Sequence, residues 1–193
     1  MATENITFND IRIVICSQGY QLDCEYLFRE IGFCCNGLSS SIPFNCRINK
    51  STIDLKNQLI IKYCENEIHG IPIVSKYENS LTMSEIKPVL KTLYNLSENG
   101  KYIGINSDEN LKGMLYKCGL GSVTVDLDTL QEFKKTNNKC PRDDDLQFIM
   151  KQDVNRFNIC NLHNRLQSQN FPICVKVKAE FLYEYCKTYI IPE

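Results

Sequence analysis

The sequence predicts an α/β fold in which a mixed five-stranded sheet is flanked by helices. Three strand-like segments joined by short turns come first, an order that is typical of an antiparallel meander. Helical and strand-like segments then alternate through the rest of the chain, which indicates βαβ crossovers. The 193 residues suffice for one domain with a substantial core, so a single domain over residues 1–193 is expected.

The first three predicted strands follow one another closely. Residues 11–16 form an apolar run rich in β-branched side chains, and residues 17–19 (Ser-Gln-Gly) follow as a predicted turn. Residues 25–35 form the second predicted strand and residues 42–48 the third, with the turn-forming segment 36–41 between them. Connections as short as these join antiparallel neighbours.

The remaining elements alternate between helix and strand. Thr82-Met-Ser-Glu85 is a capping box that opens a predicted helix, in which Pro88 lies beyond the first turn. Gly119 ends a helix that begins near Asp108. The expected elements are a helix at 55–64, where Leu55, Leu59 and Tyr63 recur at helical spacing, a helix at 82–93, a strand at 101–105, a helix at 108–118, a strand at 123–127 and an amphipathic helix at 173–185.

Composition limits the partners and the compartment. The net charge is −1, so binding to nucleic acid would need a local basic patch. The first ten residues contain no apolar signal region, and no stretch approaches the roughly 18 apolar residues of a membrane span. Eleven cysteines without a secretory signal predict a reducing compartment, cytoplasmic or nuclear. No membrane partner and no small-molecule cofactor are expected.

The most informative local pattern is Cys160-Asn-Leu-His163, which Cys174 follows. Thiolate and imidazole are ligands of tetrahedral zinc, and a C-x2-H pair can bind one ion from a single tight turn. A structural site normally has four ligands, so one more is needed. In a chain with 11 cysteines such a pair also arises by chance, and the alternative is that these thiols belong to the core.

The order of elements resembles that of the RNase H-like nucleases, especially the DnaQ-type 3′–5′ exonucleases. Glu30-Ile-Gly32 and His69-Gly-Ile71 are similar to two of their motifs. The resemblance is sharper to the Maelstrom domain, an RNase H-like domain of the piRNA pathway that carries a Glu-Cys-His-Cys zinc site. Its motifs resemble Glu30-Ile-Gly32, His69-Gly-Ile-Pro-Ile73, Cys160-x2-His163 and Cys174, and the likeness runs from about Ile11 to Tyr185.

This resemblance implies a structural zinc ion with the ligands Glu30, Cys160, His163 and Cys174. The ion would hold a C-terminal segment, residues 140–188 or so, against the second strand. Because apo forms of such sites lose their local fold, removal of the metal is expected to unfold this segment.

The exonuclease active site is not expected. Two-metal hydrolysis needs several carboxylates around two cations, and the first strand carries Ser17 and Gly19 where the exonucleases have Asp-x-Glu. The later aspartate position reads Asn110 or, with a shift, Asp108. If the motif is placed differently, Glu25, Asp108 and Asp126 are the carboxylates to test. DEDDh exonuclease activity is therefore predicted to be absent, while other ribonuclease activity stays open.

The resemblance implies a catalytically degenerate domain that binds single-stranded RNA in small-RNA silencing of the piRNA type, together with protein partners of that pathway. Arg12, Arg29 and Arg47 are expected at one end of the sheet, with Tyr20 available for base stacking. Two alternatives remain: a single-stranded RNA endonuclease with a different active site, or a protein-interaction module that binds no nucleic acid.

Overall fold

The computed structural model of the chain describes residues 5–23, 25–44, 53–73, 80–97, 100–136, 139–152 and 174–190. Within these residues five strands form one mixed sheet, in the order β3-β2-β1-β4-β5. They are β1 (Ile11–Leu22), β2 (Glu25–Cys35), β3 (Leu38–Pro43), β4 (Tyr102–Ile105) and β5 (Thr124–Asp126). The first three pair antiparallel, and β1, β4 and β5 pair parallel, so the predicted α/β class is confirmed.

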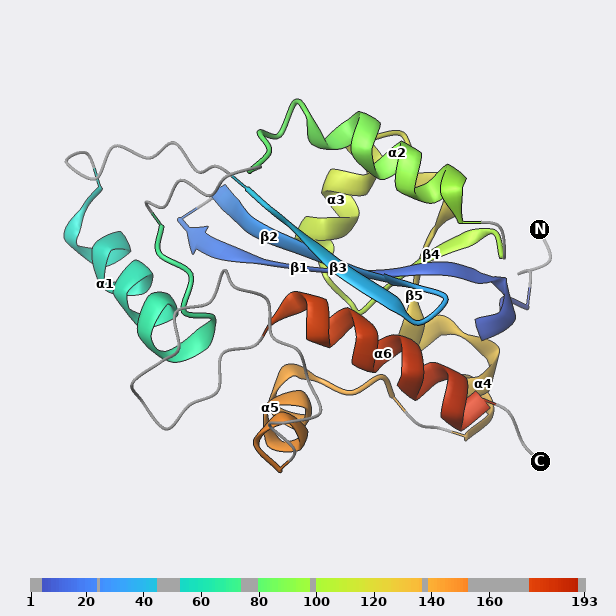
Figure 1. Cartoon of the computed structure of the whole chain (residues 1–193). Helices are drawn as coiled ribbons and strands as arrows, with labels where there is room; N and C mark the ends of the chain where they lie inside the picture. The colour runs from blue at the N-terminus through green and yellow to red at the C-terminus, as the bar shows by residue number, and fades with distance from the viewer. Residues whose placement is uncertain are drawn as a thin grey trace.

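Helices cover both faces of this sheet (Figure 1). α2 (Ile86–Leu96) and α3 (Glu109–Lys117) lie on one face, and α6 (Val175–Ile190) crosses the other. α1 (Leu55–Tyr63) lies beyond the ends of β1 and β2, on the left of the view. The shorter elements are the π-helical turn Cys64–Ile68, α4 (Gln131–Thr136), α5 (Asp143–Gln152) and the 3-10 turns Phe8–Asp10, Gly121–Val123 and Leu127–Thr129.

The alternation of side chains along β1 divides the core between the two faces. Val14 and Cys16 are buried in one cluster with Ala179 of α6. Ile13 and Ile15 are buried in a second cluster, with side chains of α2 and α3. The sheet is therefore covered on both faces, as its parallel half requires.

Elements with strong local signals lie where the sequence predicts them. β2 has the predicted bounds, Glu25–Cys35. At the start of α3 the Asp108 carboxylate accepts a hydrogen bond from the Leu111 amide, at 2.9 Å. At its end Gly119 has a φ of +78°, the left-handed conformation that glycine adopts without strain.

The capping box before α2 forms, but as a turn in front of the helix. The Glu85 carboxylate accepts hydrogen bonds from the backbone N–H of Thr82 at 2.8 Å and from its hydroxyl at 2.6 Å. The helix itself begins at Ile86. Pro88 therefore lies in the first turn, where its missing N–H breaks no helical hydrogen bond.

The predicted turn at residues 17–19 is wrong, because β1 continues through it to Leu22. The register with β2 shifts between Gln18 and Gly19, which leaves Arg29 as the extra residue of a β-bulge. Gly19 serves a close approach of two backbones rather than a turn. A Cβ at this position would lie 2.0 Å from the Leu27 carbonyl oxygen.

The third strand begins earlier than predicted. Only Asn36 and Gly37 form the connection, with φ values of +51° and +78°, the pair of positive angles that suits a two-residue hairpin. β3 therefore starts at Leu38 and ends at Pro43. The remainder of the predicted strand 42–48 lies outside the described residues from position 45 onward.

The apolar residues whose spacing predicts α1 do not face the core. Leu55, Leu59 and Tyr63 are 72%, 62% and 59% exposed, whereas Asn57 and Ile61 are buried. The Asn57 amide donates a hydrogen bond to the Asp23 carboxylate at 2.6 Å, which holds this polar face of the helix against the β1–β2 turn.

A helix approaches the sheet closely at Gly32 of β2. A Cβ on this glycine would lie 2.2 Å from both the carbonyl carbon and the carbonyl oxygen of Val175, and 2.5 Å from the backbone nitrogen of Lys176. The first turn of α6 thus rests on the bare backbone of β2, and no larger residue fits at position 32.

We predict that Gly32→Ala lowers the free energy of unfolding by at least about 2 kcal/mol, because backbone atoms must move to admit the methyl group. Gly113→Ala is the matched control. This glycine is interior to α3 with no atom within 4 Å of the added Cβ, so its replacement should stabilise by roughly 0.5–1 kcal/mol. Urea unfolding of the two variants measures both; equal effects would contradict the close approach.

Candidate functional site

Two of the four predicted zinc ligands lie at the contact between β2 and α6. Glu30 is two residues before Gly32 and shares its face of the strand, about 7 Å along the chain. Cys174 directly precedes Val175, whose backbone covers Gly32. Both side chains are 0% exposed. The fold therefore brings a buried carboxylate and a buried thiol to the same region of one sheet face.

Glu30 is a fully buried carboxylate. Its Oε2 accepts a hydrogen bond from the Gln18 side-chain amide at 3.2 Å. Burial of an ionised carboxylate is costly unless a cation or several donors compensate for the lost water. A zinc ion would supply such compensation, and carboxylate oxygen and thiolate sulfur are both ligands it accepts.

The other two predicted ligands, Cys160 and His163, lie outside the described residues. Within the described residues no group of three or more His, Cys, Asp and Glu side chains could hold a metal. Because that part of the chain contains only Glu30 and Cys174 of the predicted set, the zinc site stays a prediction.

The cysteines of the sheet are core residues. Cys16 and Cys34 are buried, and burial raises the pKa of each thiol to about 12. A thiol with so high a pKa is protonated near neutral pH and is a poor nucleophile.

A second group of polar side chains lies where the parallel pairing of β1, β4 and β5 ends. We call it the carboxyl-edge cluster. Its members are Ser17, Asn106, Ser107, Asp108, Asp126, Asp128, Arg142, Asp143 and Lys178. In open α/β sheets this edge is the usual place for a binding site.

Lys178 of α6 is the cation in one half of the cluster. Its ammonium forms an ion pair with the Asp143 carboxylate at the start of α5. Burial acts to lower the pKa of Lys178, but the nearby Cys16, Asp143 and Asp108 outweigh it and raise the pKa overall. Asp108 also accepts a hydrogen bond from the Ser17 hydroxyl at 2.6 Å.

Arg142 is the cation in the other half. Its guanidinium donates to Asp128 at 2.6 Å and to the Asn106 side-chain oxygen at 3.2 Å. The Ser107 hydroxyl donates to Asp126 at 2.8 Å. The carboxylates of this edge are thus held by hydroxyl groups, by Arg142 and by Lys178.

The carboxylates proposed for an alternative motif do not converge. Asp108 and Asp126 belong to the carboxyl-edge cluster, but Glu25 pairs with Leu22 at the far end of β1. Asn110, the other candidate for the aspartate position, is an exposed residue of α3. These positions cannot surround one pair of cations.

The predicted RNA surface at the end of the sheet is wrong for two of its four residues, Tyr20 and Arg29. Tyr20 and Arg29 are both 0% exposed. The Tyr20 hydroxyl donates to the carbonyl of Ile71, and the Arg29 guanidinium donates to the carbonyls of Phe44 at 2.7 Å and Pro72 at 2.9 Å. These side chains fix the segment 69–73 to the sheet, so they are unavailable to a ligand.

The other two members of that predicted surface are Arg12 and Arg47. Arg12 lies near the start of β1, where its guanidinium donates to the carbonyls of Gly100 at 2.9 Å and Tyr94 at 3.0 Å. It is 4.7 Å from the centre of the Tyr94 ring, so it fixes the end of α2. Arg47 lies outside the described residues.

His69 has a structural role in the same segment. It is 1% exposed, its Nδ1 accepts a hydrogen bond from the Ile71 amide at 3.1 Å, and its ring contacts the Tyr20 ring edge-on at 4.9 Å. The segment that resembles a family motif is thus a buried connection between α1 and the sheet.

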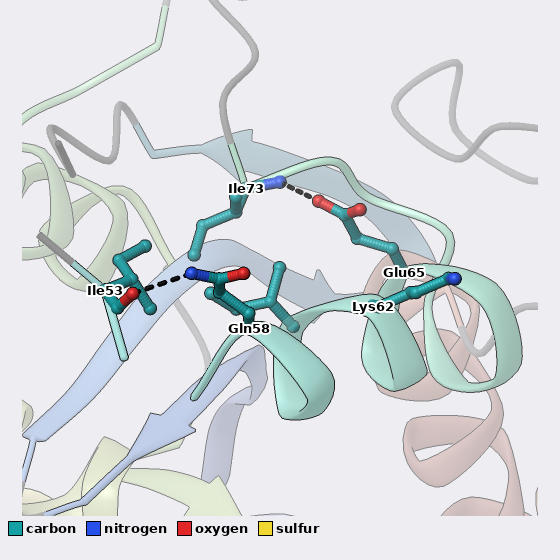
Figure 2. A pocket seen from close by; sticks show the side chains of 6 residues that line it. Ile53, Gln58, Lys62, Glu65 and Ile73 are labelled. Carbon is teal, nitrogen blue, oxygen red and sulfur yellow. Dashed lines mark hydrogen bonds between the residues drawn. The ribbon is translucent and has the colours of Figure 1, made fainter. Parts of the chain in front are cut away.

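A pocket of about 270 Å³ lies beside α1 (Figure 2). It is lined by Ile53, Gln58, Ile61, Lys62, Glu65 and Ile73. Its polar groups are used by the protein itself: Glu65 accepts from the Ile73 amide at 2.6 Å, and Gln58 donates to the Ile53 carbonyl at 2.8 Å. The lining contains one carboxylate, Glu65, and one ammonium, Lys62, and no Ser, Thr, Cys or His side chain that could act as a nucleophile.

Comparison with known protein families gave no matching family model, and comparison with curated proteins gave no significant match. None of the helices among the described residues is long and apolar enough to cross a membrane.

The ion pair of Lys178 and Asp143 yields a prediction. Lys178→Met should lower the free energy of unfolding, and Asp143→Asn combined with it should show a coupling of roughly 1 kcal/mol, small because Asp143 is 54% exposed. The folded pKa of Lys178 is raised, so its contribution is complete below the unfolded value near 10.4 and is lost as pH rises through the folded pKa.

Urea unfolding of the single and double variants at pH 8 measures the coupling, and repetition at about pH 11–12 measures its loss. Lys187→Met is the control, because it removes the same charge at an exposed position of the same helix. A double variant whose effects simply add would contradict a direct interaction.

Proposed function

We propose that the chain is a zinc-stabilised, catalytically degenerate RNase H-like domain, similar to the Maelstrom domain, that binds single-stranded RNA. One observation carries the degenerate part of the proposal. At the carboxyl edge, where a two-metal nuclease holds its cations, the positive charge is the Lys178 ammonium beside Asp143 and Asp108.

The sheet is compatible with this fold. Three antiparallel strands followed by two parallel ones, with the first strand in the middle, is the order that the resemblance implies. Helices on both faces fit it as well.

The first strand argues against two-metal chemistry. The Ser17 hydroxyl already donates a hydrogen bond to Asp108. The Leu27 carbonyl occupies the space that a side chain at Gly19 would need. Two cations about 4 Å apart need several bridging carboxylates, and a lysine ammonium within the cluster repels them. The endonuclease alternative would need residues other than these.

The proposed zinc rests on Glu30 and Cys174, two buried ligand-type side chains on one sheet face. If the ion is bound, Glu30, Cys160, His163 and Cys174 would hold it, and it would supply a cross-link between β2 and the chain before α6. Its role is structural, because four protein ligands leave no open position for a substrate.

The protein-interaction alternative is favoured by the outer face of α1. Leu55, Leu59 and Tyr63 lie at successive turns and are 72%, 62% and 59% exposed. Exposed apolar side chains aligned on a helix are typical of a surface that binds another protein. This function requires no basic patch, which distinguishes it from RNA binding.

We predict one zinc ion per chain in protein purified without chelator, measured by elemental analysis. Cys174→Ser, Glu30→Gln and His163→Ala should each lose most of the metal and lower the melting temperature, because the cross-link is lost. Cys118→Ser, a buried thiol on the opposite face, should keep the metal. A zinc-free native protein would disprove the site, as would His163→Ala with unchanged metal content and melting temperature.

We also predict no Mg²⁺- or Mn²⁺-dependent trimming of a 5′-labelled RNA oligonucleotide, together with measurable binding of that RNA at low salt. Trimming that EDTA abolishes and that Asp108→Asn removes would show that the edge is catalytic. Absence of RNA binding at low salt would leave the protein-interaction function in first place.

A further inference from the structure

The charges of the chain are unevenly distributed. The whole sequence has 22 basic and 23 acidic residues. Residues 86–97, which include α2, contain Lys87 and Lys91 and no acidic residue. Residues 110–125, which include most of α3, contain Lys112 and Lys117 and no acidic residue. In a nearly neutral protein, these two helices therefore carry four lysines and one carboxylate, that of Glu109.

The two helices lie side by side on the same face of the sheet (Figure 1). Their apolar side chains, among them Leu90 and Leu115, are buried together. Their lysines are consequently on the outside, and Lys87, Lys91 and Lys117 are all exposed. Lys87 and Lys91 are four residues apart and lie on the same side of α2.

The lysines of α2 reach the end of α3. The Lys91 ammonium lies 3.9 Å from the place of a Cβ on Gly119. Burial raises the pKa of the Cys118 thiol, and Lys87 and Lys91 act in the opposite direction, which places both ammonium groups near the end of α3. Lys117 belongs to that last turn. The negative end of the helix dipole accounts for part of this arrangement.

These three charges are not neutralised by side chains. Among the described residues neither Lys87 nor Lys91 nor Lys117 forms an ion pair with a carboxylate. Lys112 differs, because it pairs with Glu109 at 3.1 Å. The available cations are therefore Lys87, Lys91 and Lys117.

An exposed aromatic side chain, Tyr116, directly precedes Lys117 in α3. Tyr116 is 74% exposed, although its ring lies against Gly121, where a Cβ would be 2.5 Å from Cδ2. The tyrosine thus has one side supported by backbone and most of its surface open. Exposed rings of this kind next to basic side chains stack with unpaired bases, whatever the sequence.

We propose that Lys87, Lys91, Lys117 and Tyr116 form a binding surface for single-stranded RNA, with the ammonium groups on phosphates and the tyrosine on a base. The inference deepens the proposed function, because it names the surface that RNA binding requires. An anionic membrane fits less well, since interfacial helices insert a broad apolar face, and the outer side of α2 also carries Thr92 and Asn95.

The test is fluorescence anisotropy with a labelled 20-nucleotide oligo(U) probe over a salt series. Three phosphate contacts should give a log–log salt slope of about −2. Lys87→Glu/Lys91→Glu should weaken binding at least about tenfold and reduce the slope to below about 1 in magnitude. Tyr116→Ala should weaken binding about fivefold or more and leave the slope unchanged, because stacking releases no counterions.

Lys62→Glu/Lys134→Glu is the matched control, because it changes the net charge equally at two exposed lysines outside α2 and α3. If wild-type protein binds RNA and both double variants weaken it equally, the surface is wrong while the proposed function stands. If wild-type protein binds no RNA at low salt, both fall. Binding to phosphatidylserine vesicles without binding to RNA, lost in Lys87→Glu/Lys91→Glu, would also overturn the inference.

Discussion

The first turn of α6 rests on the backbone of β2 at Gly32, and the rest of the structure depends on this contact. It fixes the position of the long helix on the sheet, and with it Ala179 and Leu182 over the β1–β2 core. It also sets Cys174 near Glu30 at one end of the contact and Lys178, one helical turn later, beside Cys16 and Asp143. A side chain at position 32 would displace the start of α6, and with it both Cys174 and Lys178.

The same helix also contributes a cation, Lys178, to the carboxyl edge. Carboxylates gathered at the ends of parallel strands repel one another unless cations lie among them. In a metalloenzyme the cations come from solution, and here Lys178 and Arg142 belong to the chain. An internal cation is always present and is positioned by folding, so the carboxylates of this edge are partly compensated by side chains of the chain itself.

Local signals in the sequence were sufficient to predict where most helices and strands lie along the chain. They were insufficient to predict which face of each element is buried. Asp108 and Gly119 bounded α3 correctly because capping depends on neighbours in the chain. Burial depends on residues that are distant in the sequence. The buried face of α1 contains Asn57, which binds Asp23 of the β1–β2 turn, and not the apolar residues at helical spacing. Tyr20 and Arg29 were assigned to the surface as polar strand residues, yet the segment 69–73 covers them and accepts their hydrogen bonds. Their partners lie more than forty residues away along the chain, where no spacing rule applies.

The predicted zinc ligand Glu30 and the lysines of α2 and α3 show two different limits of prediction from sequence. In the sequence, only the family resemblance distinguishes Glu30 from other strand carboxylates, which are common. Its complete burial is known only from the structure. The lysines of α2 and α3 belong to no recognisable sequence motif, and the net charge of −1 gives no sign of a local basic surface. Net charge describes the far field, whereas a bound strand responds to charges within about a Debye length, some 10 Å. A nearly neutral chain can therefore carry a local basic surface, as the exposed lysines of α2 and α3 illustrate.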